Sequence, residues 1–269
     1  MNSKMTKHFL IILITALSIS NLKAQVLDKE KLECAYKFSW VNDTSKHNVR
    51  KEDFMILKVG DKVSDFYSYN TFRVDSAVQA DKSKGASAAE MVANRASYGK
   101  KGVDYHIFKN YPSGKMTITD KVATDNFKYE EPLNQKWQIQ PGKATISGYS
   151  AQKATCTFSG RQYTAWFTTD VPVSTGPWKF SGLPGLILKV EDKSGDFKFE
   201  LLGLHQVKDG SSIQIKDKPY IATTKEKFQK LVVKFYEDPI AYLNANTGIR
   251  ITPVNGNQTK SRPYNPIEL

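Results

Sequence analysis

Residues 155–169 read TCTFSGRQYTAWFTT, two runs in which apolar and polar residues alternate around a two-residue break. Alternation with a period of two is typical of a β-strand that buries one face. Ser159-Gly160 between the runs is the strongest signal in the sequence for a two-residue hairpin turn. This stretch therefore predicts an antiparallel β-hairpin.

Two further hairpins are predicted on either side of this one. Residues 105–109 and 115–120 flank the turn cluster NYPSG, and residues 186–191 and 197–204 flank DKSGD. Three sequential hairpins imply an antiparallel, meander-like sheet. We expect a mainly β fold, built as a curved antiparallel sheet or as an open or half barrel.

One segment has a helical period instead. Within residues 223–236, Phe228, Leu231, Val232 and Phe235 fall at i, i+3, i+4 and i+7 and form a single apolar stripe. Thr223 and Glu226 have capping-box spacing, and Pro239 marks the far end. We expect this C-terminal helix to cover an open face or end of the sheet, which makes the fold class α+β.

The remaining segments add little regular structure. Residues 86–97 are helix-prone but poor in apolar side chains, which favours a surface helix, and residues 252–269 resemble extended chain. The sequence contains no internal repeat and no break in composition. We therefore expect a single domain over residues 25–269.

The first 24 residues have the pattern of a secretory signal peptide. Lys4 and Lys7 precede the uncharged apolar residues 9–19, and Ala24 closes the segment. An uncleaved membrane anchor is the alternative, but the run is shorter than the roughly 20 apolar residues that span a bilayer. We expect export to the periplasm or the outer membrane, with no transmembrane segment after cleavage.

Composition excludes several classes of protein. The 269 residues are 40% hydrophobic and 25% charged, which argues against a disordered chain, a collagen-like fibre or a multi-span membrane protein. The net charge is +12, and it falls to +9 once the three lysines of residues 1–24 are removed. Because we expect export, and because no stripe of basic and aromatic residues appears, we predict no nucleic-acid partner.

Cys34 and Cys156 lie on the apolar faces of predicted strands. In an oxidising compartment they could form a disulfide, and as buried free thiols they would act as small hydrophobes. Strand order decides between these alternatives, and the sequence leaves both open.

Known catalytic and metal-binding motifs are absent from the sequence. His47, His106 and His205 have no second ligand at metal spacing, and there is no Gly-x-Ser-x-Gly elbow or phosphate-binding glycine loop. We predict no metal, no cofactor and no specific catalytic residue. Dispersed catalytic residues stay open, although the pattern leans away from an enzyme.

The most unusual stretch is VSTGPWKFSGLPGLILKV, residues 173–190, where apolar residues flank two turn signals. Leu183-Pro184-Gly185-Leu186 fits a type II turn with Gly185 at φ > 0. Because exposed turns are normally polar, this corner either packs in the core or borders a binding site. The candidate binding residues here are Trp178, Lys179, Phe180, Leu183, Pro184, Gly185 and Leu186.

Residues 182–187 spell GLPGLI, and the sequence closely resembles the GLPGLI family of exported Bacteroidetes proteins. The resemblance extends over GR (160–161), AWFT (165–168), VPV (171–173), GPWKF (176–180) and the terminal YNPIEL (264–269). It adds Arg161 and Trp166 to the candidate binding residues. Many relatives carry a cysteine shortly after the pair matching Gly148-Tyr149, which residues 150–155 lack, so a family-wide disulfide is in doubt. The resemblance implies a compartment and a phylum, but no reaction.

Three classes of function fit these observations. The first is an exported binding or accessory protein of the cell envelope that holds an apolar or lipid-like ligand. The second is a structural or interaction subunit of an outer-membrane transport assembly, with an outer-membrane protein as its partner. The third is an enzyme with dispersed catalytic residues, which would show a cleft where ionisable groups with perturbed pKa values converge.

Overall fold

The computed structural model describes residues 24–248, 250–252 and 261–269. The predicted signal peptide lies outside the described residues, apart from Ala24. No helix in the described ranges is both long enough and apolar enough to span a bilayer.

A large sheet of twelve strands dominates the molecule and is not closed into a barrel. Across this sheet the strands are β14 (Tyr220–Ala222), β7 (Asp125–Pro132), β6 (Lys115–Val122), β5 (His106–Lys109), β4 (Ser64–Ser68), β3 (Arg50–Val59), β2 (Leu32–Val41), β12 (Phe197–Gln206), β11 (Leu186–Asp192), β10 (Arg161–Thr168), β9 (Tyr149–Phe158) and β8 (Gln138–Ile146). Neighbouring strands are antiparallel except for β14 and β7. A two-stranded sheet pairs β1 (Gln25–Lys29) with β13 (Ser212–Ile215). The mainly β, antiparallel prediction is confirmed.

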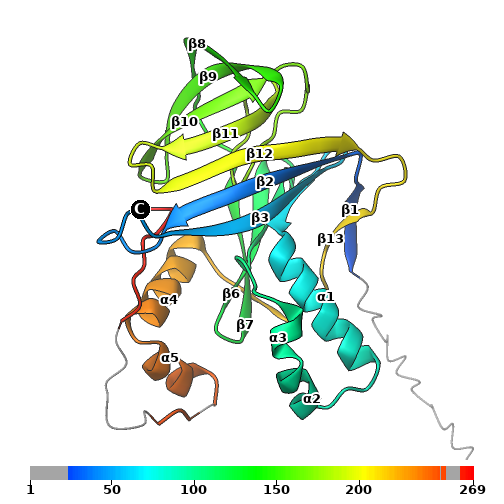
Figure 1. Ribbon diagram of the computed structural model, residues 1–269, viewed down its shortest axis with the longest axis vertical. Coiled ribbons are helices and arrows are strands. Elements are labelled where there is room, and N and C mark those ends of the chain that lie inside the picture. Colours follow the sequence, from blue (N-terminus) through cyan, green and yellow to red (C-terminus); the bar gives the residue numbers. More distant parts are fainter. Residues whose placement is uncertain (1–23, 249, 253–260) are drawn as a thin grey trace, which may run out of the picture.

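The sheet bends strongly along its length. In Figure 1, β12, β2 and β3 cross the middle of the molecule, with β8 to β11 above them and β6 and β7 running below. β2 joins the two halves, because it pairs with β12 on one side and with β3 on the other. β3 and β12 lie far apart in the sequence, and backbone hydrogen bonds to β2 hold them on either side of it.

All three predicted hairpins are present. β9 and β10 pair from Phe158 and Arg161, and Ser159 and Gly160 between them have φ values of 46° and 79°. Two positive φ values in a two-residue loop match the twist of the flanking strands. The pairs β5–β6 and β11–β12 are also antiparallel. Local turn signals thus gave the correct strand partners.

Helix α4 (Lys225–Glu237) confirms the predicted amphipathic helix. Phe228 is buried and packs on the rings of Phe127 and Tyr129, while the rest of its stripe is half-buried against the same core. Its cap is Thr224, one residue after the predicted Thr223, because the Thr224 side chain accepts the Lys227 N–H. Helix α5 (Pro239–Asn246) follows immediately.

The long helix α1 (Tyr69–Ser83) was not predicted. Only Thr71 and Val74 are buried on it, so its apolar stripe is too weak to stand out in the sequence. It packs on β3 and β4, on the sheet face opposite to the one that α4 covers (Figure 1). The expected surface helix at residues 86–97 is two short helices, α2 (Ala88–Ala93) and α3 (Arg95–Tyr98).

Cys34 and Cys156 are both buried and both free thiols. Burial raises the pKa of each thiol to about 12, so neither has thiolate character near neutral pH. The disulfide alternative is therefore absent from this structure, and the two cysteines pack as small apolar residues.

Candidate functional site

The connection between β10 and β11 folds inward and fills the core. Trp178, Phe180, Leu183 and Leu186 are no more than 2% exposed, and Lys179 is buried with them. The ring of Phe180 meets Tyr163 edge-on at a centroid distance of 4.8 Å and Trp178 at 5.2 Å. Packing accounts for these five candidate residues without a ligand.

A buried lysine on β5 fixes the backbone of this connection. The Lys109 ammonium group donates hydrogen bonds to the carbonyl oxygens of Gly176 and Trp178, the latter at 3.0 Å. Burial lowers the pKa of Lys109 to about 7. Lys109 thus supplies hydrogen bonds to backbone carbonyl oxygens that are buried away from water.

Lys179 lies in a second buried polar cluster, with Glu131, Glu268 and Lys225. Its Nζ contacts Glu131 and lies 2.8 Å from Glu268, and Lys225 bridges the same two carboxylates at 3.2 and 2.8 Å. Burial opposes ionisation of Glu268, but the ammonium groups of Lys179 and Lys225 prevail and hold its pKa below the ordinary value. The charges of the two lysines and the two glutamates cancel. Through these contacts the cluster joins the buried corner to α4 and to residues 261–269, which we call the C-terminal segment.

Arg161 also binds the C-terminal segment. Its guanidinium group pairs with Asp192 at 3.0 Å and donates to the side-chain oxygen of Asn265 and the carbonyl oxygen of Pro266 at 2.8 and 2.7 Å. Like the buried corner residues, it holds the protein together.

The turn at Gly185 differs from the predicted type II geometry. The Gly185 N–H donates to the Leu183 carbonyl oxygen at 2.8 Å, which closes a three-residue turn, and Gly185 has a φ of 157°. Pro184 is exposed and Trp166 is half-buried on the outer face of β10. The binding prediction for these two residues, for Arg161 and for the buried corner residues stays a prediction.

A cleft of about 650 Å³ lies between α1 and the outer face of β5 and β6. We call it the α1 cleft. Phe72 and Val78 of α1, Phe108 of β5 and Tyr220 of β14 form its less polar parts. Ionisable groups line the rest, contributed by Asp75, Lys82, Lys101, Asp104, His106, Asp120, Lys121, Lys216 and Lys218.

Two carboxyl groups in the α1 cleft have displaced pKa values. Burial raises the pKa of Asp120 to about 7, and the negative charge of Asp104 contributes. Burial also raises the pKa of Asp104, against the attraction of Lys101. With its pKa raised to about 7, Asp120 can hold a proton near neutral pH, which is useful for hydrogen bonding to a ligand or for acid catalysis.

His106 is held in one orientation at the wall of the cleft. Its Nδ1 lies 3.2 Å from the Asp65 carboxylate, and its ring stacks between Tyr67 and Phe108 at centroid distances of 5.1 and 5.9 Å. A carboxylate partner on Nδ1 fixes the imidazole ring and leaves Nε2 for another contact.

The hydroxyl group of Thr71 has no hydrogen-bond partner in the described part of the chain, although Thr71 is only 6% exposed. It lies in the first turn of α1 and lines the cleft. A buried hydroxyl without a partner costs free energy, so this atom is suited to a bound polar group.

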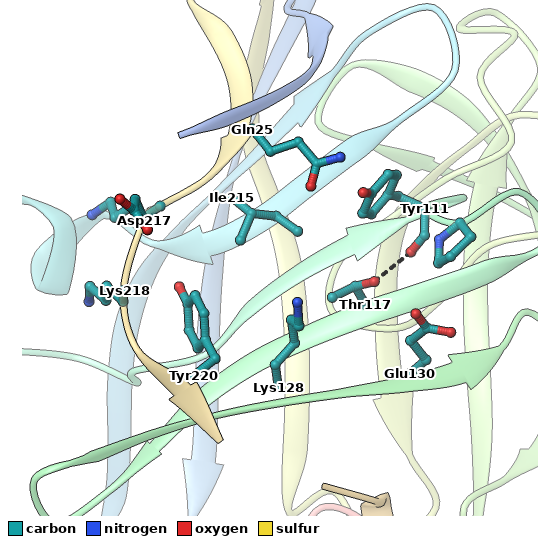
Figure 2. Close-up of a pocket in the computed structure, with 11 residues that line it drawn as sticks. Gln25, Tyr111, Thr117, Lys128, Glu130, Ile215, Asp217, Lys218 and Tyr220 are labelled. Carbon is teal, nitrogen blue, oxygen red and sulfur yellow. Dashed lines mark hydrogen bonds between the residues drawn. The ribbon is translucent and has the colours of Figure 1, made fainter. Parts of the chain in front are cut away.

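A smaller cavity of about 270 Å³ continues along the same sheet face (Figure 2). It shares Lys216, Lys218 and Tyr220 with the α1 cleft, so the segment around these residues separates two neighbouring hollows. In Figure 2, Lys128 of β7 and Tyr220 of β14 point toward Ile215. The two cavities are therefore neighbours that share one wall.

The α1 cleft was not predicted, because its walls come from α1 and from segments far apart in the chain. A recognisable signal was the Ser68 cap, whose hydroxyl accepts the Thr71 N–H at 3.0 Å. Within the described residues, no group of three or more His, Cys, Asp or Glu side chains could hold a metal ion.

Part of this chain matches a known protein family. A family model described as "Protein of unknown function (Porph_ging)" matches residues 69–189, which run from α1 to β11. No curated protein matches the chain. The matched region contains the buried corner and most of the cleft wall.

Two solved structures titled PNGF-II match this chain, and the likeness of fold rests on the first of them. The structure in space group P21 has a TM-score of 0.52 and 13% identity over 77% of this chain and 34% of the other. The structure in space group C2 has a TM-score of 0.49 and 15% identity over 77% and 33%. This chain therefore spans about a third of PNGF-II, and the likeness concerns the fold alone.

Proposed function

We propose that the protein is an exported binding or accessory protein of the cell envelope, a member of the GLPGLI family of Bacteroidetes, that holds an amphiphilic, lipid-like ligand in the α1 cleft. The N-terminal sequence pattern supports export. The α1 cleft carries the binding proposal, because its 650 Å³ combine a partly apolar wall with convergent polar groups. The core itself is filled by Trp178 and Phe180, so the ligand lies outside it.

A direct test uses residues 25–269 and monomyristoylglycerol, a single acyl chain with an uncharged head group. The lipid should displace the uncharged fluorescent dye N-phenyl-1-naphthylamine from the wild-type protein. Val78→Trp should weaken this displacement at least tenfold, because Val78 lines the cleft and an indole there takes up space beside its apolar wall.

Val92→Trp is the matched control, since Val92 of α2 is 72% exposed and does not line the cleft. It should bind as the wild type does. Equal displacement by Val78→Trp and wild type, or no displacement from the wild type, would overturn the proposal.

An enzyme that acts in the same cleft is a second candidate, favoured by the raised pKa of Asp120. A carboxyl group with a pKa of about 7 is suited to general acid catalysis near neutral pH. In such a reaction, water attacks the carbonyl carbon of an ester of the ligand and the acyl C–O bond breaks. The acyl chain leaves as a carboxylate, and the head-group oxygen takes a proton from the Asp120 carboxyl group and leaves as an alcohol. Incubation with 1-myristoyl lysophosphatidylglycerol should then release myristate, and Asp120→Asn should stop release while keeping binding.

A further inference from the structure

Lys216 and Lys218 lie on the segment that separates the two cavities, directly after β13. Both line the α1 cleft and both line the smaller cavity. Lys216 is half-buried, and its Nζ lies 5.5 Å from the centre of the Phe72 ring on α1. This position places an ammonium group beside the apolar wall of the cleft, where an amphiphile would change from chain to head group.

The two lysines have no carboxylate partner in the described part of the chain. By contrast, Lys101 in the same cleft pairs with Asp75 at 2.5 Å. Asp217 lies between the two lysines in sequence but lines only the smaller cavity (Figure 2). Burial lowers the pKa of Lys216 and the charge of Lys218 lowers it further, while Asp75 and Asp65 act in the opposite direction.

An anion bound between these lysines would remove the cost of holding them together. It would replace the hydration that Lys216 loses on burial with charge-assisted hydrogen bonds, which are stronger than neutral ones, while Lys218 is exposed. A phosphate group suits the place, because its several oxygens can accept from two ammonium groups at once. The unpartnered Thr71 hydroxyl in the same cleft offers a further donor.

From this arrangement we infer that Lys216 and Lys218 bind the phosphate head group of the amphiphile held in the α1 cleft. This inference rests on the proposed function. Phosphate free in solution has the same chemistry, so an experiment must separate the two sources.

The experiment compares three probes on the full mature chain by displacement of N-phenyl-1-naphthylamine and by calorimetry. They are 1-myristoyl lysophosphatidylglycerol, monomyristoylglycerol and inorganic phosphate. The wild type should bind the lysophospholipid about tenfold or more tightly than the uncharged lipid, as a charge-assisted contact implies. Inorganic phosphate alone should bind far more weakly, because it has no acyl chain.

Lys216→Met should remove the preference for the lysophospholipid and leave the affinity for monomyristoylglycerol unchanged. Lys216→Arg keeps the charge and should keep the preference. Lys227→Met is the charge-matched control, since Lys227 is exposed on α4 and does not line the cleft. Binding of the uncharged lipid by Lys216→Met also shows that the variant is folded.

Each contrary result has a distinct meaning. A preference retained in both Lys216→Met and Lys218→Met overturns the inference and leaves the proposed function standing. Inorganic phosphate bound as tightly as the lysophospholipid assigns the lysines to free phosphate and overturns the head-group assignment. Failure of the wild type to bind either lipid overturns the proposed function itself.

Discussion

Gly185 occupies a position where no side chain fits. A Cβ atom there would lie 1.9 Å from the carbonyl oxygen of Thr168, and backbone atoms cannot yield as a flexible side chain can. We expect Gly185→Ala to lower the free energy of unfolding by about 3 kcal/mol, as overpacking does at its upper end. Gly203→Ala, on an exposed stretch of β12 with no atom within 4 Å, should stay within about 0.5 kcal/mol. Urea denaturation of both variants checks the contrast, and equal midpoints would contradict it.

Asp120 gives the stability of the protein a pH dependence of known sign. Its pKa is about 7 in the folded protein against an ordinary value of 3.8. Between these values the folded state holds a proton that the unfolded chain has released, so stability falls as pH rises from about 4 to 7 and then levels off. Asp120→Asn should flatten this slope in thermal melts over that range. A slope as steep as that of the wild type would mean that Asp120 is not its source.

At the scale of the element, α4 depends on one ring. Phe228 is 5% exposed and contacts Phe127 and Tyr129, whereas Leu231 is only half-buried. Phe228→Ala should cost about 3–5 kcal/mol, and Leu231→Ala should cost less than the roughly 2–5 kcal/mol of a fully buried leucine. Val233→Ala, at a position 41% exposed, is the control and should be nearly neutral. If Val233→Ala lowered the denaturation midpoint most and Phe228→Ala least, the face of α4 that packs on the sheet would not be the one described here.

The elements also show where sequence patterns suffice. Hairpins are local, so Ser159-Gly160 and the other turn clusters identified the correct strand pairs. The α4 stripe was equally clear, because four apolar residues repeat at helical spacing. Helix α1 has no such stripe, since it buries only Thr71 and Val74, and the sequence pattern therefore did not predict it. The α1 cleft could not be predicted for the same reason, and the buried corner was recognised as unusual without its packing being known.

At the scale of the whole molecule, the buried cluster of Lys179, Glu131, Glu268 and Lys225 joins the corner, β7, α4 and the C-terminal segment. Adjacent Glu130 and Glu131 provide a matched comparison, because Glu131 is buried in this cluster while Glu130 pairs with Lys115 on the surface. Glu131→Gln should cost about 3–5 kcal/mol, since it leaves Lys179 buried without full compensation. Glu130→Gln should cost about 0–1 kcal/mol. Similar losses in chemical denaturation would show that the buried cluster contributes no more than a surface pair.

The pairing of β2 with β12 means that one edge of β2 stays unpaired while most of the chain is still being made. β2 ends at Val41, and its second neighbour begins at Phe197. At about 5–20 residues per second, synthesis of the intervening chain takes on the order of ten seconds. During this time one edge of β2 presents unpaired backbone groups to neighbouring nascent chains, and such an edge is a template for aggregation. We therefore expect this edge of β2 to stay open to such contacts until β12 has been made and pairs with it, which joins the two halves of the sheet.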